Sequence, residues 1–183
     1  MSEQPFADDK DWTWVLNELC PECRYEVREF DVTTVGDLIR ANAQEWIEII
    51  AATDAAKLSS RPRPDRWSAL EYACHVRDVL ALYNYRLGLM LNEDGPHYPN
   101  WNQDETAIEK DYSASNAVEV AVDLKANAEA LARHFGIVRD EDWERPGFRS
   151  DGAAFTIETF ARYLMHDPEH HLHDVRQGLA ALQ

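Results

Sequence analysis

Apolar residues recur three and four positions apart in four stretches of the chain, which is the spacing of amphipathic helices. No alternation of apolar and polar residues is strong enough to favour strands over these helices. The sequence therefore predicts four helices of about 20 to 27 residues each. They begin at Thr34, at Ser68, at Ser115 and near Thr156, and the second and third end at about Asn92 and Phe135.

Short-range signals support the ends of these helices. Ser68 and Glu71 have the spacing of a capping box, in which each side chain accepts a hydrogen bond from the other residue's backbone N–H. The prolines of residues 59–66 interrupt the helical pattern, because each lacks an N–H and restricts the residue before it. Gly136 follows the third helix and suits a left-handed position beyond its end.

Four helices of this kind favour an all-α fold, a four-helix bundle. The connection over residues 93–114 is long enough to carry the chain along the bundle, so we expect the second and third helices to run parallel. Residues 1–32 are irregular and rich in aromatic side chains. We expect this N-terminal extension to pack on the bundle formed by residues 33–183.

Composition and charge narrow the classes of function. The chain has 183 residues, of which 45% are hydrophobic, and this is enough for one domain with a full core. Its net charge of −16 argues against nucleic-acid binding, which needs clustered Lys and Arg. No apolar run approaches the roughly 20 residues of a membrane span. We expect a soluble, cytoplasmic protein with no membrane partner.

Three cysteines are too few for a disulfide framework. Cys20 and Cys23 form the sequence CPEC, and Cys74 lies within a helical pattern. A structural zinc site would draw on a second ligand pair with similar spacing, and none follows. The flanks also lack the strand and helix of a thioredoxin-like motif. We expect a proline-containing turn, with redox chemistry or weak metal binding as the alternatives.

Four of the seven histidines lie close together between His166 and His173. With His166 at 0° and about 100° per residue, the apolar positions of this helix centre near 180°. His166 and His170 then fall near 0° and 40°, almost opposite the core, whereas Asp167 and His171 fall near 100° and 140°, on its flank. Either i, i+4 pair can hold a metal ion from one side. The phase favours Asp167 and His171 as the inward pair.

Pro168 keeps two simpler interpretations open. Asp167 suits the N-cap of a helix that starts with Pro168 at its first position, and the histidines would then decorate a short final helix. Alternatively, they form a solvated polar face. His75 on the second helix, taken alone, is typical of a hydrogen-bonded residue at the edge of a core.

Two motifs resemble one known family. The segment RWSALEYACHVRDV contains Trp67, Ser68 and His75, and the last helix carries HDPEHHLHDV. Together they resemble the DinB/YfiT-like superfamily of metalloenzymes. The resemblance implies a four-helix bundle with up-down-down-up order and frequent homodimers. It also implies one divalent metal ion, zinc or nickel, held by a histidine of the second helix and an i, i+4 pair of the last.

The resemblance maps these ligands onto His75, Asp167 and His171. Asp167 is a carboxylate where many members have histidine, and the branch of mycothiol-dependent maleylpyruvate isomerases is similar in this respect. The rival register uses His166 and His170 as the pair. We favour the first register because the helical phase agrees with it. Asp78 and Asp174 are candidates for carboxylates that hold a histidine ligand in one tautomer.

Three protein ligands leave positions open for water or substrate, as catalytic sites require. Characterised members of the family look like transferases or isomerases that use thiols such as mycothiol or bacillithiol. The resemblance therefore implies a metal-dependent, low-molecular-weight-thiol S-transferase or isomerase that acts on a small molecule. The alternative is a non-enzymatic metal-binding or stress-response protein of the same fold. The sequence leaves the substrate and the metal open.

Overall fold

All four expected helices are present in the computed structural model of the protein, which describes residues 11–182. The first ten residues of the predicted N-terminal extension lie outside the described residues. The helices are α1 (Val35–Ala52), α2 (Ala55–Leu58), α3 (Ala69–Asn92), α4 (Gln103–Glu109), α5 (Ala117–Phe135) and α6 (Ile157–Ala181), with 3₁₀ turns η1 (Thr13–Leu16), η2 (Val32–Thr34), η3 (Tyr112–Ala114) and η4 (Asp140–Glu144). The strands are β1 (His97–Tyr98), β2 (Pro146–Arg149) and β3 (Ala154–Thr156).

The predicted capping box begins α3. The Glu71 N–H donates to Ser68 Oγ at 3.2 Å, and the Ser68 N–H donates to Glu71 Oε2 at 2.8 Å. Arg61 donates from Nε to the same carboxylate at 2.9 Å. Burial raises the pKa of Glu71, but the hydrogen bonds from Arg61 and Ser68 outweigh this and leave the pKa below its usual value. The start of α3 is therefore held by an ionised carboxylate.

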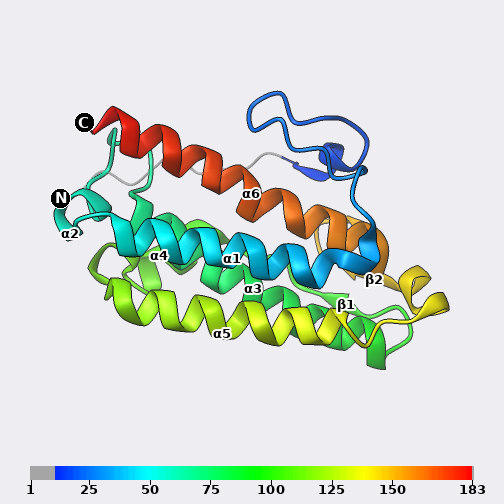
Figure 1. The fold of residues 1–183 in the computed structure, drawn as a ribbon. Coiled ribbons are helices and arrows are strands. Elements are labelled where there is room, and N and C mark those ends of the chain that lie inside the picture. Colours follow the sequence, from blue (N-terminus) through cyan, green and yellow to red (C-terminus); the bar gives the residue numbers. More distant parts are fainter. Residues whose placement is uncertain (1–10, 183) are drawn as a thin grey trace.

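Helices α3 and α5 run parallel, as the long connection predicts (Figure 1). Asn127 Nδ2 on α5 donates to the Arg77 carbonyl on α3 at 3.0 Å, and His134 Nδ1 lies 2.9 Å from Asn84 Oδ1. From the first pair to the second, both helices advance by seven residues. Helices α1 and α6 run in the opposite direction, so the order is up-down-down-up and the predicted fold class is confirmed.

Side chains from all four long helices form one core. Tyr83 of α3 stacks on Phe160 of α6, with ring centroids 4.4 Å apart. Burying large apolar side chains removes apolar surface from water, which is the main favourable term in folding. The largest fully buried side chains include Trp46, Tyr112, Phe160, Ile39, Leu87, Leu124, Leu131 and Leu164. None of the helices within residues 11–182 has the length and apolarity that a membrane crossing requires.

The connections contain more structure than the sequence predicts. The long connection before α5 includes β1 and α4, and β1 pairs with β2 in parallel while β2 pairs with β3 antiparallel. These strands have only two to four residues, too few for alternation to be recognised. Gly136 has φ −62°, so the expected left-handed position is wrong. The chain continues in right-handed turns there, with the Val138 N–H donating to the Phe135 carbonyl at 3.1 Å.

Helix α6 runs through Pro168 without a break. The helix is therefore the one expected to begin near Thr156, and the alternative interpretation of a helix start at Asp167 and Pro168 is wrong. The N-cap of this helix is Thr156, whose side chain accepts from the Thr159 N–H at 3.2 Å. Proline lacks the N–H that would bond to the carbonyl of Leu164, but packing against the core holds the helix together. Residues on both sides of Pro168 consequently keep one helical phase.

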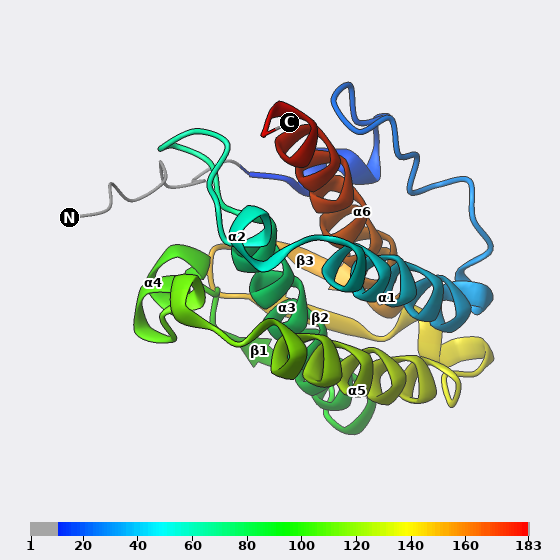
Figure 2. The same cartoon turned by 60° about the vertical axis from the view of Figure 1, so that its left-hand side comes forward.

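The N-terminal segment lies along α6 on the side away from α5 (Figures 1 and 2). Val15, Cys20 and Val27 are almost fully buried. Arg162 of α6 donates from Nη1 to the carbonyls of Val27 at 2.7 Å and Phe30 at 3.1 Å. This segment therefore covers a face of α6 that the bundle leaves uncovered.

Candidate metal centre

The three residues that the sequence favours as metal ligands lie together in the bundle. His75 comes from α3, and Asp167 and His171 come from one face of α6. One ligand atom from each lies within 4.8 Å of the others. His75 Nε2 is 3.2 Å from Asp167 Oδ1 and 3.4 Å from Oδ2, and His171 Nε2 is 3.9 Å from Asp167 Oδ2. The Asp167 carboxylate thus stands between two imidazoles.

The spacing fits a single bound ion. Two nitrogen or oxygen ligands on one tetrahedral zinc ion lie about 3.4 Å apart, given metal–ligand bonds of about 2.0 to 2.2 Å. The distances from the Asp167 carboxylate to His75 and His171 lie near this value. A set of two imidazoles and one carboxylate suits zinc and other divalent transition metals. These three residues can therefore hold a metal ion, and their role as ligands stays a prediction.

Burial and charge also suit a cation at this position. The His75 side chain is fully buried, while the Asp167 side chain is 32% exposed. Partial burial raises the pKa of Asp167, but the neighbouring imidazoles of His75 and His171 hold it well below its usual range. The carboxylate is ionised and reachable from solvent. The cluster therefore offers a negative ligand together with an open side.

Asp174 holds His171 in a defined orientation. Its Oδ2 lies 3.2 Å from His171 Nδ1, on the ring edge that faces away from Asp167. A carboxylate at this place favours a proton on Nδ1 and leaves Nε2 free to bind a metal. The candidate role of Asp174 therefore agrees with its position.

Asp78 lies in a different network. It accepts from Arg77 Nε at 2.9 Å, from Lys110 Nζ at 2.9 Å and from the Tyr112 hydroxyl at 2.6 Å. Within residues 11–182, no hydrogen bond joins Asp78 to His75, and the buried Nδ1 of His75 has no hydrogen-bond partner. Asp78 is positioned to anchor the segment before α5 and not to orient a metal ligand.

Aromatic side chains surround the two imidazoles. Trp101 stacks on His75, with centroids 5.3 Å apart and planes 14° from parallel, and Trp67 packs on the same ring at 5.4 Å. Tyr72 packs on His171 at 4.9 Å. The indole of Trp101 is itself held by a hydrogen bond from Nε1 to Thr106 Oγ1 at 2.7 Å. These rings give the candidate centre apolar walls.

A cavity of about 460 Å³ lies beside this centre. Trp67, Tyr72 and Asp174, which contact the two imidazoles, also line the cavity. Two basic residues, Arg63 and Arg66, line it as well. Its volume falls within the roughly 300 to 1,000 Å³ typical of small-molecule sites.

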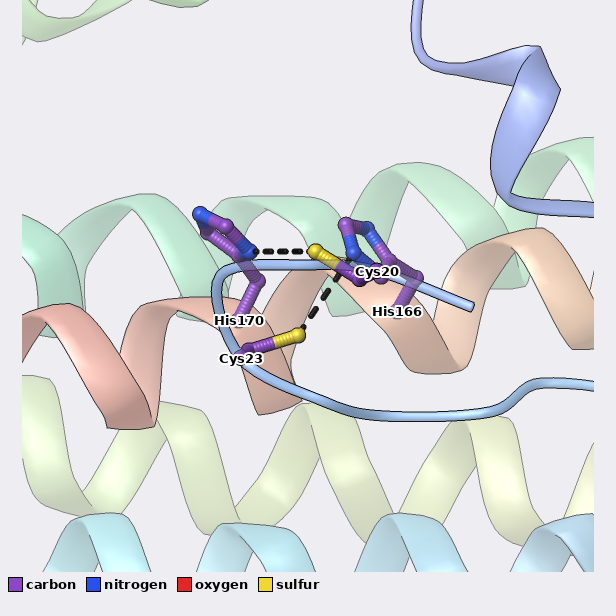
Figure 3. Close-up of side chains that lie close together, drawn as sticks. All are labelled: Cys20, Cys23, His166 and His170. Atoms are coloured by element: carbon purple, nitrogen blue, oxygen red, sulfur yellow. Dashed lines mark hydrogen bonds between the residues drawn. The ribbon is translucent and has the colours of Figure 1, made fainter. Parts of the chain in front are cut away.

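His166 and His170, the rival pair, face another part of the molecule. They point away from the bundle core, as the helical phase predicts. The alternative interpretation of a solvated polar face is wrong for them, because they are only 4% and 6% exposed. The N-terminal segment covers them and places Cys20 and Cys23 against their rings (Figure 3). Helical phase gives the direction of a side chain, but it does not reveal a segment that packs on the helix from outside.

Burial affects the ionisation of the group formed by Cys20, Cys23, His166 and His170. It raises the pKa of the Cys23 thiol to about 12 and lowers the pKa of His166 to about 4. Without a cation, the neutral forms of both side chains are therefore favoured. The sequence alone predicts no contact between these cysteines and histidines, because 143 to 150 residues separate the members of each pair.

Comparison with known proteins agrees with the fold. YfiT from Bacillus subtilis, described as a probable metal-dependent hydrolase with an unusual four-helix bundle topology, has a TM-score of 0.70 and 15% identity over 98% of this chain and 97% of that chain. A mutant of the mycothiol-dependent maleylpyruvate isomerase has a TM-score of 0.62 and 10% identity, covering 77% of this chain and 59% of that chain. Curated protein sequences include no match.

Sequence comparison identifies the family directly. The model of the DinB superfamily matches residues 37–175, which include most of α1, all of α3 and α5, and the candidate ligands His75, Asp167 and His171. The resemblance seen in the two histidine-containing motifs is thereby confirmed. This chain belongs to the DinB superfamily.

Proposed function

We propose that this protein is a metal-dependent enzyme that transfers or isomerises a small molecule with the help of a low-molecular-weight thiol. The observation that carries this proposal is the convergence of His75, Asp167 and His171 from two helices within 4.8 Å of one another. Three protein ligands leave at least one position open on a four-coordinate ion, which is the arrangement of catalytic centres. A closed structural site would need a fourth ligand from the protein.

The protein shapes the surroundings of this centre. Trp67, Trp101 and Tyr72 pack on the imidazoles and cover those faces, while the partly exposed Asp167 leaves one side open. A divalent metal held there would act as a Lewis acid and lower the pKa of a water or thiol that reaches the open position. Asp174 keeps the His171 proton on Nδ1, away from that position.

The adjoining cavity supports a small, polar ligand. Arg63 and Arg66 line it together with the acidic Glu22 and Asp174, so it offers groups of both charges. Mycothiol dependence is a property of one structural neighbour, and hydrolysis is attributed to the other. We therefore propose a thiol reaction first and treat hydrolysis as the outcome that would replace it.

The test is a paired assay on the full-length protein loaded with zinc or nickel. Mycothiol, bacillithiol and glutathione are each offered with an aryl chloride, and the expected product has a new bond between sulfur and carbon, with release of chloride and a proton. An ester hydrolysis assay runs in parallel. We expect thiol transfer that stops when the metal is removed and returns when it is restored.

Variants identify the residues involved. His171→Ala is expected to reduce the rate to background and to lower the metal content, whereas the exposed His97→Ala is the matched control and is expected to change neither. Unchanged rates in both His75→Ala and His171→Ala would contradict an enzyme built on this centre. Ester hydrolysis without thiol transfer would contradict the thiol reaction while leaving the metal enzyme intact.

A further inference from the structure

Two cysteines and two histidines from distant parts of the chain form a second cluster. Cys20 and Cys23 lie on the N-terminal segment, and His166 and His170 lie one turn apart on α6 (Figure 3). Their two sulfur and two nitrogen atoms all lie within 4.8 Å of one another. This cluster lies outside the candidate centre formed by His75, and neither cysteine is needed by the proposed reaction.

The distances match those around one tetrahedral ion. With metal–sulfur bonds of about 2.3 Å and metal–nitrogen bonds of about 2.05 Å, a sulfur and a nitrogen on the same zinc ion lie about 3.6 Å apart. Cys20 Sγ is 3.6 Å from His170 Nδ1, and Cys23 Sγ is 3.7 Å from His166 Nε2. The other separations stay within 4.8 Å, so a single ion can bind all four atoms once the cluster contracts slightly around it.

The donor atoms indicate which metal would bind. Two thiolates and two imidazoles arranged in a tetrahedron are the ligands of structural zinc sites, whereas hard ions such as magnesium and calcium prefer oxygen. Cys20 is fully buried, and both histidines are nearly so. We propose that Cys20, Cys23, His166 and His170 form a closed structural zinc site that fastens the N-terminal segment to α6.

Local backbone structure brings the two thiols together. The Arg24 N–H donates to the Cys20 carbonyl at 3.0 Å, which closes a tight loop around Cys23. Arg24 has φ +62°, a left-handed conformation that non-glycine residues rarely adopt. On α6, unbroken helix through Pro168 keeps His166 and His170 on one face.

Neighbouring groups complete the surroundings expected of a zinc site. His170 binds through Nδ1, and its Nε2 lies 3.7 Å from Asp174 Oδ2 and 3.8 Å from Glu22 Oε2. These separations exceed a direct hydrogen bond, but they place negative charge beside the imidazole, which favours a bound cation. The Trp12 ring packs on His166 at 5.5 Å and on His170 at 5.2 Å, which covers the cluster from outside.

This proposal does not depend on the proposed enzymatic function. Four protein ligands leave no position on a tetrahedral ion for substrate. The centre formed by His75, Asp167 and His171 has only three and leaves one open. The two sites together predict two divalent ions per chain, one bound by sulfur and one without sulfur. A failure of either site can therefore be recognised without an activity measurement.

The experiment titrates metal-free, full-length protein with cobalt(II) and measures the absorption spectrum. We expect two cobalt ions per chain, with thiolate-to-cobalt charge transfer from one of them. Cys23→Ser, at a half-buried position, is expected to lose that band and one ion. His75→Ala is expected to keep the band and lose the other ion. Cys74→Ser and His97→Ala are the matched controls and are expected to keep both ions.

A second measurement covers the case in which Cys23→Ser fails to fold. The rate at which a thiol reagent modifies Cys23 in the wild-type protein is compared before and after zinc is added in excess over both sites, and zinc is expected to slow it at least tenfold. Wild-type protein that gives no thiolate-to-cobalt band and no zinc protection would overturn the proposal. Cys23→Ser protein that binds two cobalt ions would overturn it as well.

Discussion

His170 and His171 are consecutive in the chain but face different clusters. His170 Nδ1 lies 3.6 Å from Cys20 Sγ, whereas His171 Nε2 lies 3.9 Å from Asp167 Oδ2. Successive helical residues point about 100° apart, so the two side chains leave α6 in different directions. A short stretch of α6 therefore contributes to two groups of potential ligands, which lie on different sides of the helix.

Asp174 connects these two clusters, and Asp174→Asn is expected to weaken both. Its Oδ2 lies 3.2 Å from His171 Nδ1 and 3.7 Å from His170 Nε2. Loss of a carboxylate that orients a histidine ligand typically lowers metal affinity about 10- to 100-fold. Competition with a zinc chelator measures the affinity, and the exposed Asp123→Asn on α5 is the control. An unchanged affinity at both sites would show that Asp174 is a solvated carboxylate.

The main helices were predictable because their signals are local. The Ser68–Glu71 capping box and the apolar spacing depend on neighbours within about one or two turns. Helical phase also predicted that Asp167 and His171 face inward, and the unbroken α6 makes that arithmetic valid. The part of the fold and site that follows from short-range geometry was therefore accessible from sequence.

The second cluster was missed because it depends on a long-range contact. Cys23 and His166 are 143 residues apart, and no second pair of cysteines with the CPEC spacing follows in the sequence. A C-x₂-C pair combined with an H-x₃-H pair was the signal present in the sequence. Which segment would cover His166 and His170 was not available from the phase of α6 alone.

Arg162 is expected to hold the N-terminal segment in place. Its Nη1 donates to the Val27 and Phe30 carbonyls, and charged hydrogen bonds of this kind are worth about 1.5 to 3 kcal/mol. In Arg162→Ala, local opening and protease cleavage within residues 17–31 should become about 10- to 100-fold faster. Timed limited proteolysis measures this, with Arg133→Ala on the surface of α5 as the control. Cleavage at the wild-type rate would mean that other contacts hold the segment.

Asp78 is expected to stabilise the fold except in strong acid. Burial raises its pKa, but hydrogen bonds from Arg77, Lys110 and Tyr112 outweigh this and leave the pKa below its ordinary value of 3.8. The contribution is therefore complete above about pH 4 and is lost as the pH falls through the lowered pKa of the folded state. Asp78→Asn should lower the free energy of unfolding by about 1.5 to 3 kcal/mol at pH 7.

Urea denaturation at several pH values measures the effect. The difference between wild-type protein and Asp78→Asn should shrink as the pH falls below about 4, because the wild-type carboxylate then takes up a proton. The exposed Asp94→Asn is expected to have little effect at any pH. A difference that stays constant down to strong acid would contradict an ionised Asp78 as the source of the stability.

Pro168→Ala is expected to raise stability slightly and to leave both metal sites intact. Proline inside a helix costs about 3 kcal/mol relative to alanine. That figure already includes the greater freedom of the unfolded alanine chain, and the substitution loses about 1.6 kcal/mol through two buried methylene groups. The balance favours alanine by about 1.4 kcal/mol. In contrast, Pro64→Ala in the exposed loop before α3 should lower stability, since only the unfolded-chain effect applies there.

Thermal unfolding of the two variants should therefore shift in opposite directions. A loss of stability in Pro168→Ala would indicate that the proline ring contributes more to the packing around His166 and His170 than its two methylene groups account for.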